Sequence, residues 1–176
     1  MRQPGGGPDG EAFWRFSLAL YARPGAAAAL LRLQDRAGLD VNLLLFALWC
    51  GASRAVRLDA ERLAAATAAS VAIKEAVEPL RGLRRRLKGA ELGDGDRLRQ
   101  RVAVLEVAAE REAQRCLAAA AAGWSALPEP DRFAAASANL SLCLGAEDAS
   151  AEAALLREAA TALMRVSSAF PVRPTA

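Results

Sequence analysis

The segment VNLLLFALWCG, residues 41–51, constrains the fold more than any other part of the chain. Every position in it is apolar or glycine except Asn42. A membrane-spanning helix needs about 20 apolar residues, and this run is too short. A helix that is apolar on all sides is usually buried on all sides. We therefore expect a central helix from Val41 to Ala52, with Asp40 as its N-cap because its carboxylate can accept hydrogen bonds from free N–H groups.

The remainder of the chain also has helical patterns. Alanine, the strongest helix former, supplies much of the apolar content of 53%, and no segment shows sustained period-two alternation. A chain of 176 residues fits one domain with a substantial core. The sequence predicts an all-α, single-domain bundle of six or seven helices around the buried central helix. Pro79 interrupts a helical pattern at residues 60–88, and we expect a kink or a break there.

Composition sets the expected limits of the domain. Residues 1–10 are rich in Gly and Pro and lack a signal-peptide core, so we expect a disordered leader there. The all-α domain follows at 11–167, with halves at 11–88 and 94–167, and residues 168–176 form a flexible tail. Three cysteines without CxxC spacing favour a reduced, cytoplasmic compartment. No run is long enough to span a membrane, and the oligomeric state stays open.

The absence of histidine excludes several classes of enzyme. Ser-His-Asp and Cys-His catalysis need an imidazole base, and di-iron carboxylate bundles need Glu-x-x-His pairs. No phosphate-binding glycine loop is present either. We expect no cofactor and no metal site, and we favour a non-catalytic protein while leaving enzyme activity open. Four glutamates are interpreted as helix-surface charges that pair with nearby cations rather than as metal ligands: Glu75, Glu78, Glu106 and Glu110.

A basic segment provides the leading candidate for a partner- or anion-binding surface. It contains five cations and no acid: Arg81, Arg84, Arg85, Arg86 and Lys88. Arginine offers bidentate donors to phosphate and carboxylate groups, so the segment suits an acidic protein, a nucleic acid or an anionic lipid surface. A solvated helix face at the negative end of the helix dipole is the other interpretation. We favour a binding or adaptor module with a protein partner. RNA or ribosome association is the alternative, although few aromatic residues lie nearby for base stacking.

A second candidate site surrounds the turn that precedes the central helix. Polar residues flank this turn, and aromatic side chains are expected beside it: Gln34, Asp35, Asp40, Asn42, Trp14, Tyr21 and Trp49. The polar residues suit a capping network that holds the turn, because Asp and Asn favour such positions. The alternative is a polar pocket for a small ligand, or an enzyme site. Spacing alone does not separate these interpretations.

Three segments resemble a proteobacterial family known as domain of unknown function 2390: FWRFSLALYARPG, LQDRAGLDVNLLLFALWCG and VEPLRGLRRRLKG. The resemblance covers residues 13–88 and is weaker after Gly89. It is carried by Phe13, Trp14, Tyr21, Pro24, Leu33, Gln34, Asp35, Asp40 to Phe46, Pro79, Leu80, Arg81, Arg85 and Lys88. The resemblance implies the fold of that family and a bacterial, cytoplasmic protein, and it assigns no catalytic residue.

Overall fold

The computed structural model describes residues 8–88, 95–128 and 131–169. Over these ranges the chain forms seven α-helices and one 3-10 helix, with no strand. The helices are α1 (Pro8–Tyr21), α2 (Ala26–Ala37), α3 (Val41–Arg54), α4 (Ala60–Leu87), α5 (Gly95–Ala120), α6 (Arg132–Leu144), η1 (Gly145–Ala149) and α7 (Ala151–Ala169). The predicted all-α fold is confirmed.

The two ends of the domain lie close to the predicted limits. α1 begins at Pro8, so residues 8–10 are helical, although the sequence predicts a leader there. α7 ends at Ala169, just inside the predicted tail. Residues 1–7 and 170–176, which make up most of the predicted leader and tail, lie outside the described residues.

Helix α3 forms the buried centre of the bundle, as predicted. Ten of its 14 residues are buried, and α1, α2, α5, α6 and α7 all contact it. The rings of Phe13 and Trp49 stack with centroids 5.0 Å apart, and Phe46 packs beside both. The Asp40 carboxylate accepts a hydrogen bond from the Asn42 N–H at 2.9 Å, as expected of an N-cap.

Within the described ranges, no helix combines the length and apolar character that a membrane crossing requires.

Helix α6 packs on α3 so closely at Gly51 that no room remains there for a side chain. A Cβ atom at Gly51 would lie 2.3 Å from the Cα of Ala136, so only glycine permits this approach. Asn139, fully buried on α6, accepts a hydrogen bond from the Leu58 N–H and donates one to the Val56 carbonyl, both at 2.8 Å. These bonds satisfy buried backbone groups in the segment that follows α3.

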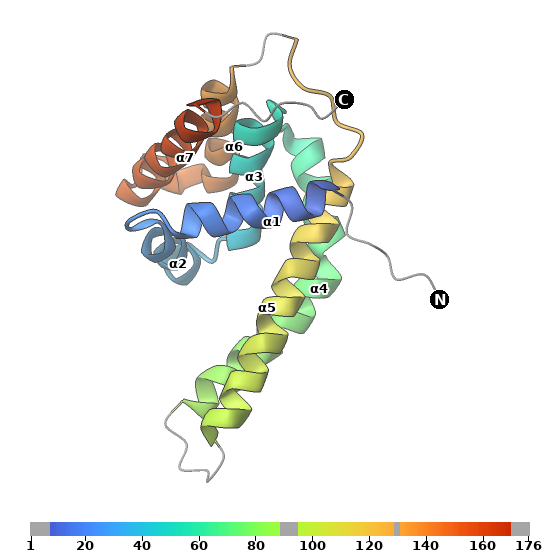
Figure 1. The fold of residues 1–176 in the computed structure, drawn as a ribbon, viewed down its shortest axis with the longest axis vertical. Helices are drawn as coiled ribbons and strands as arrows, with labels where there is room; N and C mark the ends of the chain where they lie inside the picture. The colour runs from blue at the N-terminus through green and yellow to red at the C-terminus, as the bar shows by residue number, and fades with distance from the viewer. Residues whose placement is uncertain (1–7, 89–94, 129–130, 170–176) are drawn as a thin grey trace.

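Helices α4 and α5 pair antiparallel and form a long hairpin whose far end projects away from the other helices (Figure 1). We call this pair the arm and the remaining helices the body. Val77 and Leu87 of α4 and Val102 of α5 are buried. Pro79 does not break α4, which is one helix of 28 residues. Pro79 itself is exposed, and because α4 packs along α5 on both sides of it, the packing outweighs the one lost hydrogen bond.

Candidate functional site

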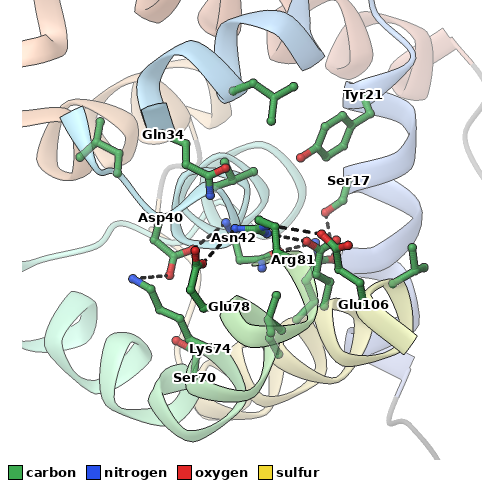
Figure 2. A pocket seen from close by; sticks show the side chains of 18 of the residues that line it. Ser17, Tyr21, Gln34, Asp40, Asn42, Ser70, Lys74, Glu78, Arg81 and Glu106 are labelled. Carbon is green, nitrogen blue, oxygen red and sulfur yellow. Dashed lines mark hydrogen bonds and ion pairs between the residues drawn. The ribbon is translucent and has the colours of Figure 1, made fainter. Parts of the chain in front are cut away.

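A cleft of about 690 Å³ lies between the body and the arm. Helices α1, α2 and α3 line it on one side, and α4 and α5 line it on the other (Figure 2). Six of the seven residues predicted for a polar pocket line this cleft: Trp14, Tyr21, Gln34, Asp35, Asp40 and Asn42. Trp49 does not, because its ring is buried in the core against Phe13.

The polar residues around the turn have two kinds of role. One oxygen of the Asp40 carboxylate caps α3, and the other lies 3.3 Å from the Nζ of Lys74 on α4. Asp40 therefore both holds the turn and joins the body to the arm across the cleft. No hydrogen bond or ion pair within the described ranges involves the side chains of Gln34 and Asp35. Capping thus accounts for Asp40 but not for these two neighbours.

Gln114 of α5 connects the arm to two helices of the body. Its buried side chain accepts a hydrogen bond from the Ser17 hydroxyl at 3.0 Å and donates one to the side-chain oxygen of Asn42 at 2.9 Å. Sequence reasoning missed this residue. It follows Glu110 by four positions on the same helix face, and this spacing is the signal that could have placed it in the cleft.

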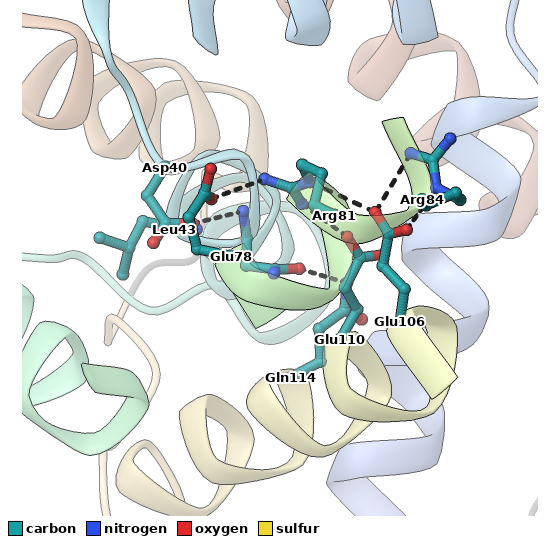
Figure 3. A network of polar contacts seen from close by, with 9 residues as sticks. Asp40, Leu43, Glu78, Arg81, Arg84, Glu106, Glu110 and Gln114 are labelled. Atoms are coloured by element: carbon teal, nitrogen blue, oxygen red, sulfur yellow. Dashed lines mark hydrogen bonds and ion pairs between the residues drawn. The ribbon is translucent and has the colours of Figure 1, made fainter. Parts of the chain in front are cut away.

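A network of arginines and glutamates joins α4 to α5 at one end of the cleft (Figure 3). The Arg81 guanidinium lies 3.3 Å from Glu106, 2.8 Å from Glu110 and 3.5 Å from Glu78. Arg84 contacts the second oxygen of Glu106 at 2.5 Å. Glu106 is only 6% exposed, so this carboxylate lies between the two helices and not on an open surface. Glu78, Glu106 and Glu110 pair with Arg81, as expected, whereas no ion pair within the described ranges involves Glu75. The expectation that all four are surface charges is wrong for Glu106, because it is buried between the two helices.

The charges in this network are stable near neutral pH. Burial alone would raise the pKa of Glu106, but the hydrogen bonds and charges of Arg84 and Arg81 lower it overall. Burial would lower the pKa of Arg81, but its bonds to the glutamates raise it, and the bond to Glu106 raises the pKa of Arg84. A general acid or base works best with a pKa near the working pH. Glu106 therefore acts as a fixed negative charge.

Tyr21 presents a neutral hydroxyl to the cleft. Burial, together with the negative charge of Glu110, raises the pKa of the phenol to about 12. Its hydroxyl therefore stays protonated near pH 7 and can donate a hydrogen bond.

Within the described ranges, no group of three or more Cys, Asp or Glu side chains is arranged to hold a metal ion.

The predicted basic segment is divided between two environments. Arg81 and Arg84 are held in the network with the glutamates. Arg85, Arg86 and Lys88 are exposed, and no ion pair involves them within the described ranges. Arg85 lines the cleft, whereas Arg86 and Lys88 lie outside it. The segment therefore contributes both to the cleft and to the free surface of the arm.

The far end of the arm is strongly basic on both helices. We call the described residues 84–88 and 95–105 the arm tip. They contain seven cations and one acid: Arg84, Arg85, Arg86, Lys88, Arg97, Arg99, Arg101 and Asp96. Three apolar side chains at the arm tip are 45–69% exposed: Leu98, Val104 and Leu105. Sequence reasoning missed the contribution of α5, because only the hairpin pairing brings it beside the basic segment of α4.

A comparison of the sequence with known protein families finds a match over the part of the chain that forms the cleft. The family described as "protein of unknown function (DUF2390)" matches residues 12–117. The chain belongs to the DUF2390 family. The match covers most of α1, all of α2 to α4 and most of α5, so it includes every residue that lines the cleft. It extends beyond Lys88, where the resembling motifs end. Comparison with curated proteins and with solved structures finds no match.

The motifs that resemble the DUF2390 family fall into two places in the structure. Some of their residues are buried in the core, including Phe13, Leu33 and Phe46. Others line the cleft: Trp14, Tyr21, Gln34, Asp35, Asp40, Asn42, Arg81 and Arg85. Segments that are far apart in the sequence thus meet in one place.

Proposed function

We propose that this DUF2390 protein is a non-catalytic binding module that contacts an acidic protein partner through the arm tip. The observation that carries the proposal is the surplus of positive charge at the end of the projecting hairpin. The described residues of the arm tip hold seven cations and one acid, and the sequence over residues 84–105 holds seven cations and three acids. Five of these cations form no ion pair within the described ranges: Arg85, Arg86, Lys88, Arg97 and Arg101. Like charges on adjacent turns repel, and an acidic partner would relieve that repulsion.

The apolar side chains of the arm tip favour a protein over RNA. Leu98, Val104 and Leu105 are exposed beside the cations, and an amphipathic helix with acidic residues would match both features. Proteins that bind single-stranded RNA commonly stack bases on aromatic rings. The sequence from residue 60 to residue 122, which contains the whole arm, has no aromatic residue.

The chemistry of the cleft supports a binding role over a catalytic one. The pKa of Tyr21 is raised to about 12 and that of Glu106 is lowered, so both move away from the range near pH 7 that acid–base catalysis favours. We place this module in the bacterial cytoplasm, where unpaired cysteines such as its three stay reduced.

The experiment reverses charge at the arm tip without altering the cleft. The variant carries Arg86→Glu, Lys88→Glu and Arg101→Glu, three exposed residues that do not line the cleft. The matched control makes the same change of net charge on the body, with substitutions at three other exposed residues: Arg15→Glu, Arg57→Glu and Arg132→Glu. Each protein is used to capture partners from its host cells, and the recovered partner is quantified by mass spectrometry.

We expect the arm-tip variant to recover at least about tenfold less of an acidic protein that the parent and the control recover equally. Equal recovery by all three proteins would rule out the arm tip as the contact surface. If the lost component is instead RNA, sensitive to nuclease and steeply dependent on salt, the protein-partner proposal fails and the RNA alternative stands.

A further inference from the structure

We propose that the cleft between the body and the arm binds a small zwitterionic peptide, with the ammonium group of the peptide at Asp35 and its carboxylate at Arg85. Arg85 belongs both to this cleft and to the arm tip, but the substitutions that test the arm tip, at Arg86, Lys88 and Arg101, do not line the cleft, so the two proposals are tested independently.

The two walls of the cleft differ in charge. On the body side, α2 contributes the carboxylate of Asp35, the turn before α3 contributes that of Asp40, and none of the lining residues is a cation. On the arm side, α4 and α5 contribute four cations and three carboxylates: Lys74, Arg81, Arg84, Arg85, Glu78, Glu106 and Glu110. A ligand with opposite charges at its two ends matches this arrangement, whereas a ligand of one charge is repelled by one wall.

Most of these charges already have partners within the protein. Lys74 pairs with Asp40, and the arginine–glutamate network accounts for most of the others. Asp35 on α2 and Arg85 on α4 remain, one on each wall, and no ion pair within the described ranges involves them. They can form charge-assisted hydrogen bonds with a ligand without breaking an existing pair.

Other groups that line the cleft also suit a peptide. The side chains of Gln34 and Tyr21 point into the pocket from the body side (Figure 2), and no hydrogen bond occupies either within the described ranges. An amide side chain can donate to and accept from a peptide bond. Three apolar side chains about half exposed also line the cleft: Leu18, Leu31 and Val107. The volume of about 690 Å³ falls within the range of roughly 300–1,000 Å³ of small-molecule pockets. A short peptide with apolar side chains fits all of these features.

The test uses isothermal titration calorimetry with leucyl-leucine in four forms at pH 7. The forms are the free dipeptide, the N-acetylated dipeptide, the C-amidated dipeptide and the dipeptide blocked at both ends. We expect the free form to bind, and we expect removal of either charge to weaken binding by about three- to tenfold, as for a partly exposed charge-assisted contact.

Two variants assign each charge to its residue. Asp35→Asn should abolish the effect of acetylation while keeping the effect of amidation, and Arg85→Gln should do the reverse. Both side chains are exposed, so the far-ultraviolet circular dichroism of each variant should match the parent. Glu158→Gln and Arg132→Gln, on exposed body residues outside the cleft, serve as matched controls. The inference is overturned if no form binds, if the doubly blocked form binds as well as the free one, or if neither variant changes the preference.

Discussion

Replacement of Gly51 by alanine should destabilise the protein by about 3 kcal/mol. The added Cβ would lie 2.2 Å from the backbone nitrogen of Ala136 and 2.3 Å from its Cα, whereas carbon atoms in contact are separated by about 3.5–4.0 Å. Both atoms belong to the backbone, so α6 would have to move away from α3 by more than about 1 Å. Overpacking of this kind costs about 1–3 kcal/mol and occasionally more, and a clash with backbone belongs at the upper end.

The helix propensity of alanine opposes the clash, so the sign of the measured change in the free energy of unfolding shows whether the clash exists. Alanine is favoured over glycine inside a helix by about 1 kcal/mol, so without the clash the substitution would stabilise α3. Gly82→Ala isolates that effect, because a Cβ there would meet only the flexible end of Arg86, at 3.8 Å. Gly82→Ala should therefore raise the free energy of unfolding by up to about 1 kcal/mol.

Urea unfolding followed by circular dichroism at 222 nm measures both variants. For Gly51→Ala we expect a lower urea midpoint and a melting temperature about 6–12 °C below that of the parent, the shift that about 3 kcal/mol produces in a domain of this size. For Gly82→Ala we expect an unchanged or higher midpoint. If Gly51→Ala were as stable as the parent, α6 could not pack on α3 as closely as described.

Three further predictions concern polar groups. Asn139→Ala should lower the free energy of unfolding by about 2–4 kcal/mol, because it leaves buried backbone groups unsatisfied; a loss below about 1 kcal/mol in urea unfolding would contradict this. Glu106→Gln should cost about 2 kcal/mol at pH 7. The folded pKa of Glu106 lies below its ordinary value of 4.5. The difference in free energy of unfolding between this variant and the parent should therefore persist above pH 4.5 and shrink as pH falls further. A difference that stays constant down to pH 3 in urea unfolding would count against the network. Tyr21, the single tyrosine, should ionise near pH 12 in an ultraviolet titration. Because its folded pKa lies above the ordinary value of 10, stability should decline as pH rises above 10. Glu110→Gln should lower the titration midpoint, and a midpoint near 10 in the parent would refute the raised pKa.

The central helix could be predicted from the sequence because the residues that determine it, an apolar run and its N-cap, are adjacent in the chain. A run that is apolar on every side is stable at the buried centre of a helical bundle, and the side chain of Asp40 caps the helix that the run forms. The grouping of Gln34, Asp35 and Asn42 also followed from chain proximity, since all lie close to one turn. The structure adds the arm as the opposite wall of their cleft.

The features that sequence reasoning missed depend on which helices face one another. Helical spacing places Arg81 and Arg84 on one stripe, but it does not say that Glu106 of another helix lies opposite them. The same limit applies to Gln114, whose partners lie on α1 and α3. At Pro79 the local rule predicted a kink or a break, and α4 does not break there because it packs along α5.

Arginine footprinting with phenylglyoxal, read by mass spectrometry on the protein alone and in complex with its captured partner, tests the proposed contact surface most directly. We expect Arg86, Arg97 and Arg101 to lose reactivity in the complex, while Arg57 and Arg132 on the body keep theirs. Undiminished reactivity at the three arm-tip arginines, with protection at the body arginines instead, would contradict the assignment of the arm tip as the surface that binds the partner.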